Sequence, residues 1–179
     1  ALDLRRSILR WNEESVWKEN SSWQAFLKMD KIQVNEQISA YYNLTYPKDN
    51  NISGFVEMNA SKLNRSGLHT HPYILASHSY AEESSPIHRG VFTSRKILGR
   101  TLRPPTEAVS FRNADFDPNW TMRQKVTELT KAANCMSCHD QINSTGFVLE
   151  NYDATGRMRS KIDGKPLSLI HISEPTRLW

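Results

Sequence analysis

Long apolar runs, clusters of like charge and cysteines are all scarce in this chain of 179 residues. No apolar run approaches the roughly 18 residues of a membrane span, so we expect no membrane span in this fragment. Lysine and arginine are spread along the sequence and the net charge is only +4, which gives no sign of nucleic-acid binding. A length of 179 residues suits one domain or two small ones, while an apolar content of 38%, low for a compact core, and a mean hydropathy of −0.61 predict that much of the chain is exposed or loop.

The two cysteines lie together, in the run Cys135-Met136-Ser137-Cys138-His139. In a Cys-x-x-Cys-His run, the thiols can add to the two vinyl groups of a haem as thioethers, and the histidine can bind the iron. The motif therefore predicts covalent haem c, held by Cys135 and Cys138, with His139 as the proximal iron ligand. Thioether attachment takes place outside the cytoplasm, so we expect a periplasmic or exported protein.

Three other uses of the cysteines remain open. A structural zinc site needs four ligands, commonly with a second Cys or His pair at similar spacing, and no such pair follows. A redox dithiol of the thioredoxin kind has a strand before it and a helix after it, whereas a helix-like segment precedes Cys135. A disulfide is possible in an oxidising compartment, but it would leave His139 unexplained.

Apolar residues recur at helical spacing from residue 2 to residue 42, which predicts two or three helices. Asp30 and Asn35 are expected to separate or cap them, and three tryptophans, Trp11, Trp17 and Trp23, are expected in the core. The fold class that follows is mainly α, with short helices, long irregular loops and a cytochrome c-like haem module at the C-terminal end.

The helical spacing is lost between residues 45 and 66, where Asn, Ser and Gly are frequent, and this predicts a linker with one short strand at residues 55–58. A buried helical turn is expected after Pro72. The segment 68–99 also contains four histidines: His69, His71, His78 and His88. We expect them to be polar surface residues, and the alternative is that they bind a metal.

Prolines mark the ends of the next predicted helices. Ser85-Pro86 predicts an N-cap and a first helical residue, and Pro104-Pro105 is expected to end that helix. An extended connector then leads to Asp117-Pro118, which predicts the start of a helix to about Ala133. Residues 146–153 read as a short helix or turn that offers apolar side chains to one pocket.

The last ordered feature predicted is a hairpin over residues 161–165, turning at Asp163-Gly164. Glu150 and Asp153 are candidates to anchor Arg89 or Arg157 structurally rather than to act as catalytic acids.

Several motifs follow one another in a fixed order and spacing: Gly67-Leu68 through His71-Pro72, Ser84-Ser85-Pro86-Ile87-His88-Arg89-Gly90, Ile97-Leu98-Gly99 with Pro104-Pro105, Cys135 to His139, and Gly146-Phe147-Val148-Leu149-Glu150-Asn151-Tyr152-Asp153-Ala154-Thr155-Gly156-Arg157. Together they resemble the C-terminal part of a family of large exported bacterial cytochrome c-like proteins, which are built from domains of unknown function. The resemblance covers most of residues 1–167, and the opening helices resemble the end of a preceding domain.

The chain departs from the family's pattern in two places. The chain has Ile142-Asn143-Ser144 where the family often has an apolar residue or Met followed by Asp-Pro, and Met158 where the family tends to have an aromatic residue. The last residues, 168–179, resemble a translated sequencing adapter and are left out of the fold and function, including His171.

The predicted domains follow from these boundaries. Residues 1–46 form the helical end of a preceding domain, 47–66 a linker, 67–110 a helical segment that packs on the haem module, and 111–167 the haem module. The chain begins in the middle of a helical pattern, at Ala1-Leu2-Asp3-Leu4, so we expect a fragment of a longer protein.

The remaining haem contacts are less sharply defined by the sequence. Phe147 is a candidate apolar contact, and Arg157, like Arg159, could pair with a haem propionate. The distal iron position decides the reaction. Met158 and His78 are the main candidates for the distal ligand, and the other upstream histidines are further ones.

The resemblance implies a haem-bearing protein but no established reaction, so whether the chain is an enzyme is left undecided. We expect single-electron transfer between a redox partner protein and neighbouring domains of the parent chain. The alternatives are a peroxidase-like haem enzyme with an open distal site and, more weakly, a structural haem in a binding module.

Overall fold

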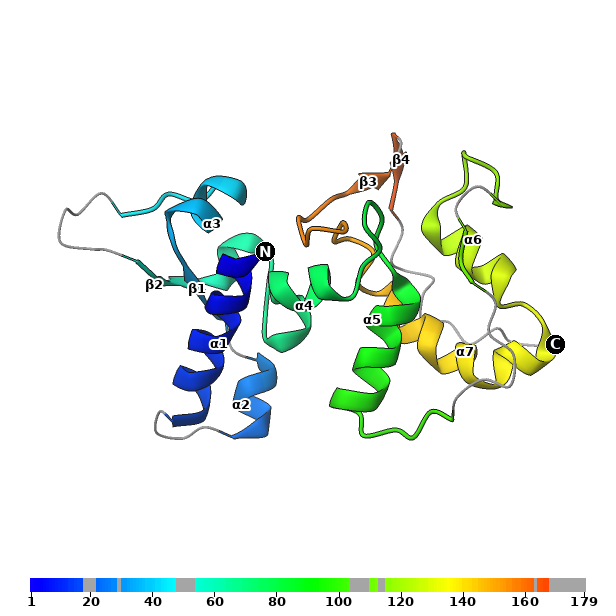
Figure 1. Cartoon of the computed structure of the whole chain (residues 1–179), viewed down its shortest axis with the longest axis horizontal. Coiled ribbons are helices and arrows are strands. Elements are labelled where there is room, and N and C mark those ends of the chain that lie inside the picture. The colour runs from blue at the N-terminus through cyan, green and yellow to red at the C-terminus, as the bar shows by residue number, and fades with distance from the viewer. Residues whose placement is uncertain are drawn as a thin grey trace. The chain divides into compact units, whose positions relative to one another are not determined.

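The computed structural model describes residues 1–17, 22–28, 30–47, 54–103, 110–112, 115–162 and 164–167. These residues form two compact units. Unit 1 contains Ala1–Ser77 together with Gly156–Met158, and unit 2 contains His78–Thr155 and the chain from Arg159 onward. Short helices predominate in the described residues, beside two small two-stranded sheets, which confirms the prediction of a mainly α fold at this coarse level (Figure 1).

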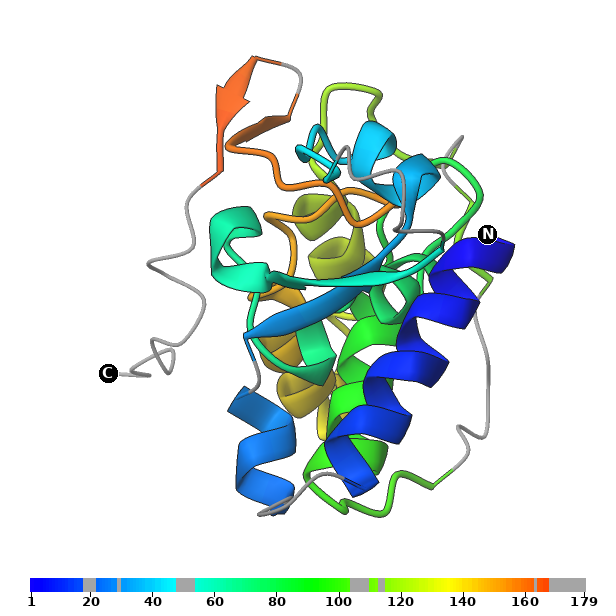
Figure 2. The ribbon, with the colours of Figure 1, turned by 90° about the vertical axis from the view of Figure 1, so that its left-hand side faces the viewer.

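Unit 1 is built around a two-stranded antiparallel sheet, in which Ile32 pairs with Met58. The helix α1 runs alongside this sheet (Figure 2). The described elements of unit 1 are α1 (Leu2–Trp17), α2 (Trp23–Lys28), β1 (Lys31–Val34), α3 (Glu36–Tyr41), β2 (Val56–Asn59), the 3-10 helices η1 (Ala60–Leu63) and η2 (Leu68–Thr70), and α4 (Pro72–Ser77).

The strand β1 lies inside the region that the sequence predicted to be helical, so that prediction is wrong for residues 31–34. Residues 31–34, Lys-Ile-Gln-Val, are too few for the spacing of their two apolar residues to distinguish a strand from a helix. Its pairing partner β2 is 25 residues further along the chain, and the pair places Ile32 and Val34 in the core with Ile38, Tyr42 and Ala60.

Local capping was predicted more accurately than burial in unit 1. The side chain of Asn35 accepts a hydrogen bond of 2.9 Å from the backbone N–H of Ile38 and so caps α3 as predicted. Trp11 is buried as expected, but Trp17 and Trp23 are 82% and 55% exposed. The expectation that all three tryptophans are core residues is therefore wrong for two of them.

The contacts divide the chain after Ser77, whereas the sequence predicts a linker at residues 47–66. Within that range, residues 56–63 form β2 and η1 and pack against the core of unit 1. Residues 48–53 lie outside the described residues. The short strand predicted at residues 55–58 is present as β2, one residue further along.

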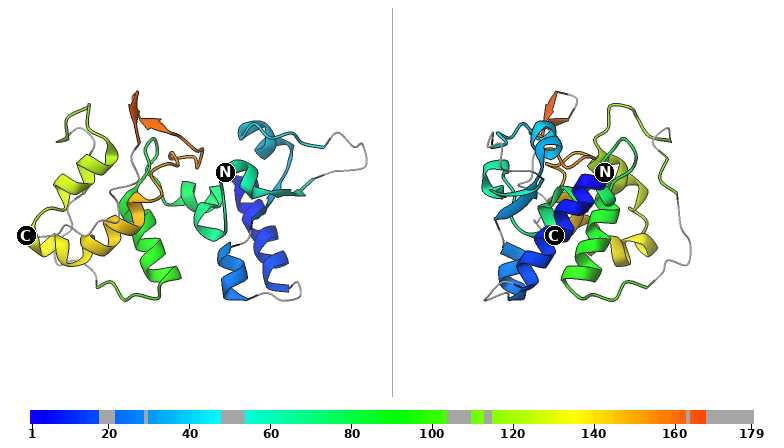
Figure 3. Two further views of the ribbon diagram at one scale, coloured as in Figure 1. Left: turned by 180° about the vertical axis from the view of Figure 1, so that it is seen from behind. Right: turned by 60° about the vertical axis from the view of Figure 1, so that its left-hand side comes forward.

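Unit 2 is organised around the helices α5 and α7, which pack closely (Figure 3). An alanine Cβ at Gly90 would lie 2.0 Å from the carbonyl oxygen of Ile142, and one at Gly146 would lie 2.0 Å from that of Pro86. The described elements of unit 2 are α5 (Pro86–Phe92), the π-helix η3 (Thr93–Ile97), α6 (Met122–Leu129), α7 (Ala133–Phe147), β3 (Lys161–Ile162) and β4 (Lys165–Pro166).

The starts and ends of these helices differ in part from the prediction. Ser85 caps α5, with Pro86 in its first turn, as predicted. The helix ends earlier than expected, because η3 stops at Ile97, and Gly99 follows with φ +64°. Pro104 and Pro105 lie outside the described residues.

The helix α6 begins at Met122 instead of directly after Asp117-Pro118. The side chain of Asp117 caps a turn, since it accepts a hydrogen bond of 2.8 Å from the backbone N–H of Asn119. Thr121 and Gln124 form a capping box that starts the helix instead. The hairpin predicted near residue 163 is present as β3 and β4.

Candidate functional site

The Cys-x-x-Cys-His motif lies in the first half of α7, which begins at Ala133. Cys135, Cys138 and His139 are at positions i, i+3 and i+4, so they share one face of the helix. All three residues are partly exposed, and both cysteines are free thiols. The helix therefore presents two thiols and an imidazole together at a surface that a further group can reach.

The imidazole of His139 is held from one side. Its Nδ1 lies 3.1 Å from Oδ1 of Asn143, one turn further along α7. The amide nitrogen of Asn143 donates to Oγ1 of Thr130 over 2.9 Å, and this hydroxyl donates to the carbonyl of Val126 over 2.8 Å. This line of hydrogen bonds joins the ring to the C-terminal end of α6.

These observations test whether covalent haem suits the motif. Haem c requires two thiols that are not joined to each other, and a histidine nitrogen free to bind iron. Both cysteines are free and Nδ1 of His139 faces Asn143, so Nε2 is the nitrogen left for a metal. Histidine ligands of metals commonly engage their second nitrogen in this way. The residues fit the group.

Phe147, a predicted haem contact, is buried in the core of unit 2. It packs with Met122 and Val126, and the guanidinium of Arg123 lies 5.2 Å from the centre of its ring. Phe147 occupies the same helix as the motif, two turns beyond His139. In this structure its clearest role is to join α7 to α6.

Arg157 and Met158 belong to unit 1, whereas the Cys-x-x-Cys-His motif belongs to unit 2. The guanidinium of Arg157 donates a hydrogen bond of 2.8 Å to the carbonyl of Tyr41 and lies 3.9 Å from the centre of the Tyr41 ring. Met158 is half exposed. Arg157 thus has protein partners within unit 1.

The histidines suggested as distal ligands divide between the two units. His78, in unit 2, is partly buried with its ring centre 4.6 Å from that of Phe92. His71, in unit 1, is only 4% exposed. Its Nδ1 accepts a hydrogen bond of 3.2 Å from the backbone N–H of Tyr73, and its Nε2 lies 3.3 Å from Oγ of Ser7.

His71 therefore differs from the polar-surface histidine that the sequence predicted. Burial, assisted by the positive charge of Arg65, lowers the pKa of His71 from 6.5 to about 3. Burial also lowers the pKa of His69. His71 is a neutral core group of unit 1 at ordinary pH.

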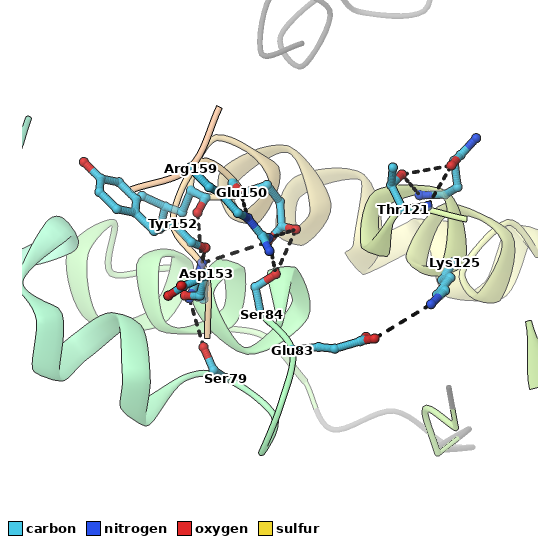
Figure 4. A network of polar contacts seen from close by, with 12 residues as sticks. Ser79, Glu83, Ser84, Thr121, Lys125, Glu150, Tyr152, Asp153 and Arg159 are labelled. Carbon is cyan, nitrogen blue, oxygen red and sulfur yellow. Dashed lines mark hydrogen bonds and ion pairs between the residues drawn. The ribbon is translucent and has the colours of Figure 1, made fainter. Parts of the chain in front are cut away.

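A buried network of charges holds the segment that follows α7 (Figure 4). The guanidinium of Arg89 donates to the backbone carbonyls of Leu149, Tyr152 and Asp153 over 2.9, 2.8 and 2.6 Å. Glu150 forms ion pairs with Arg89 and Arg159 at 3.9 and 3.5 Å. The prediction that Glu150 anchors Arg89 structurally is confirmed.

Burial dominates the electrostatics of this network. It lowers the pKa of Arg89 to about 10, although Glu150 opposes the change, and it raises the pKa of Glu150. Arg159 also donates to Oγ of Ser84 over 2.9 Å, and Ser84 donates to Glu150 over 3.0 Å. Arg159 thus has protein partners within unit 2.

A cavity of about 620 Å³ lies elsewhere in unit 2. Apolar side chains of Phe116, Trp120 and Met122 line it together with the cations Lys125 and Arg159. The residues of the Cys-x-x-Cys-His motif are not among those that line it. Among the described residues, no group of three or more His, Cys, Asp or Glu side chains is placed to hold a metal ion.

Comparison with known protein families assigns the chain to one of them. Residues 65–162, more than half of the 179, match PSCyt3, described as a protein of unknown function (DUF1588). The chain belongs to this family. The PSCyt3 match covers the Arg89 network and the Cys-x-x-Cys-His motif.

No curated protein and no solved structure matches the chain. In the part of the chain that the structure describes, no helix is both long enough and apolar enough to cross a membrane.

Proposed function

We propose that this chain is a c-type haem protein that carries single electrons. The observation that supports this most directly is the shared face of α7, on which Cys138 and His139 lie one turn beyond Cys135 and both thiols are free. Cys135 and Cys138 would hold the porphyrin through thioethers, and Nε2 of His139 would bind the iron. The haem, when bound, supplies a one-electron Fe(III)/Fe(II) couple.

Partial exposure of the motif supports electron transfer as its use. Both cysteines and His139 are partly exposed, so a group attached to them would lie near the surface of unit 2. A redox centre near the surface can exchange electrons with a partner protein or with neighbouring domains of a longer chain. Thioether attachment implies that the protein works in the periplasm or outside the cell.

Covalent attachment tests the proposal. The full chain, exported in cells that carry the cytochrome c maturation machinery, is expected to keep haem-dependent peroxidase stain on a denaturing gel. The double variant Cys135→Ala/Cys138→Ala is expected to lose the stain, because neither thioether can form. Met136→Ala/Ser137→Ala changes the two residues between the cysteines and is the matched control. Stain retained by the double cysteine variant would refute the proposal.

The visible spectrum tests the electron-transfer assignment separately. An electron carrier is expected to give a six-coordinate, low-spin spectrum in both oxidation states. Replacement of candidate distal ligands, His78→Ala and Met158→Ala, then identifies the sixth ligand by a change to a high-spin spectrum. A high-spin spectrum in the unaltered protein, together with turnover of peroxide, would contradict electron transfer and favour a haem enzyme.

A further inference from the structure

We infer that Asn143 is a positioning residue for His139: it holds the imidazole in the tautomer with the proton on Nδ1, and so makes Nε2 the metal-binding nitrogen. This inference rests on the proposed haem attachment for its use. The geometry behind it is the line of three hydrogen bonds from His139 through Asn143 and Thr130 to Val126.

The donor and the acceptor of each hydrogen bond can be assigned in turn, starting from the carbonyl of Val126. The carbonyl of Val126 can only accept, so the hydroxyl hydrogen of Thr130 points to it. The oxygen of Thr130 then has only lone pairs to offer, and it accepts from the NH₂ group of Asn143. This leaves the amide oxygen of Asn143 facing His139. An amide oxygen can only accept, so Nδ1 of His139 carries the proton.

Burial keeps this arrangement from reversing. Asn143 is 7% exposed and Thr130 is 3% exposed, so water does not readily replace their partners. A flipped Asn143 amide would set its NH₂ group against the protonated Nδ1, and its oxygen against a hydroxyl whose hydrogen is already used. Both groups would lose their hydrogen bonds inside the protein, which is costly. The end of α6 therefore determines the tautomer of a residue on α7.

Asn143 also sets the strength of the hydrogen bond that Nδ1 of His139 donates. A carboxylate in the same place would accept a charge-assisted hydrogen bond, which is stronger than one to a neutral amide. The ring would then donate more electron density through Nε2 and would favour the ferric state of a bound iron. A neutral amide at residue 143 therefore keeps the reduction potential higher than an aspartate would.

The reduction potential of the haem-loaded full chain tests this. Asn143→Asp is expected to favour the ferric state at least about tenfold, which is a downward shift of about 59 mV for one electron. Gln141→Glu is the matched control, because it adds the same charge to an exposed residue of α7 that bonds Arg100 and not His139. Equal shifts in the two variants would show a general effect of charge and overturn the inference.

The tautomer can be measured without haem, which separates this inference from the proposed function. Nitrogen-15 NMR of the haem-free full chain is expected to show His139 protonated on Nδ1 near neutral pH. Asn143→Leu and the nearly isosteric Thr130→Val are each expected to shift the population toward the Nε2-protonated form. A wild-type His139 protonated on Nε2 would overturn the inference. If the wild-type protein carries no haem stain but its His139 is protonated on Nδ1, haem attachment is refuted and the inference about Asn143 stands.

Discussion

His71 is an ionisable residue that unit 1 keeps neutral. It is almost fully buried beside Trp11, Ser7 and the backbone of Tyr73, and burial lowers its pKa to about 3. In an unfolded chain the pKa returns to about 6.5. Between these values the unfolded state binds a proton that the folded state does not, so the free energy of unfolding falls as the pH falls.

We expect unit 1 to lose up to about 1.4 kcal/mol of stability for each pH unit below 6.5 because of His71. Urea unfolding followed by tryptophan fluorescence at pH 7 and pH 5 measures this loss. His71→Asn keeps an acceptor near the place of Nδ1 and cannot titrate, so its stability should change less between the two pH values. An identical pH dependence in both proteins would assign the loss to other groups.

Residues of the candidate site were predictable where they lie close together in the sequence. Cys135, Cys138 and His139 follow from three positions in one run, and the structure places them on one face of a helix. Asn143 was noted only as a departure from a pattern. Its partner Thr130 is 13 residues away, and only the packing of α6 against α7 brings the two together.

At the scale of elements, two glycines set how closely α5 and α7 approach. A Cβ at either Gly90 or Gly146 would meet a backbone carbonyl oxygen of the other helix, each at 2.0 Å. Backbone cannot move aside as a side chain can, so the helices would have to separate. Overpacking of this kind costs about 1–3 kcal/mol, which exceeds the gain of about 1 kcal/mol in helix propensity from glycine to alanine.

Gly90→Ala is therefore expected to lower the midpoint of thermal unfolding of unit 2, measured by circular dichroism. Ser137→Ala, at an exposed residue of α7, is a control that alters the helix against which Gly90 packs without changing the contact. If Gly90→Ala has the same unfolding midpoint as this control, the close approach of the two helices does not limit which residue can stand at position 90.

Helix ends were predicted where a side chain caps its own helix. Asn35 and Ser85 were recognised because each accepts from a backbone N–H three residues later. Asp117 was wrongly given the same role, since the capping box of Thr121 and Gln124 lies four residues beyond it. Strand β1 was missed because its pairing with β2 depends on contacts distant in the sequence.

At the scale of the whole molecule, the described residues form two clusters of buried apolar side chains, one in each unit. The chain length predicted one domain or two small ones but could not place the boundary. Residues 156–158 show why, because they interrupt unit 2 in sequence and yet belong to unit 1. The carbonyl of Gly156 accepts a hydrogen bond from Arg65, and no pattern of neighbouring residues predicts this long-range contact.

Two matched substitutions test whether each cluster supports its own unit. Val34 and Val126 are both fully buried, the first in unit 1 and the second in unit 2. Truncation of either valine to alanine is expected to cost about 2 kcal/mol, because buried methyl groups are removed and a cavity remains. Hydrogen exchange should show Val34→Ala lowering amide protection in β1 and α3, and Val126→Ala lowering it in α6 and α7. Loss of protection spread evenly over both units by either variant would mean that the two clusters unfold as one, against the division that the contacts indicate.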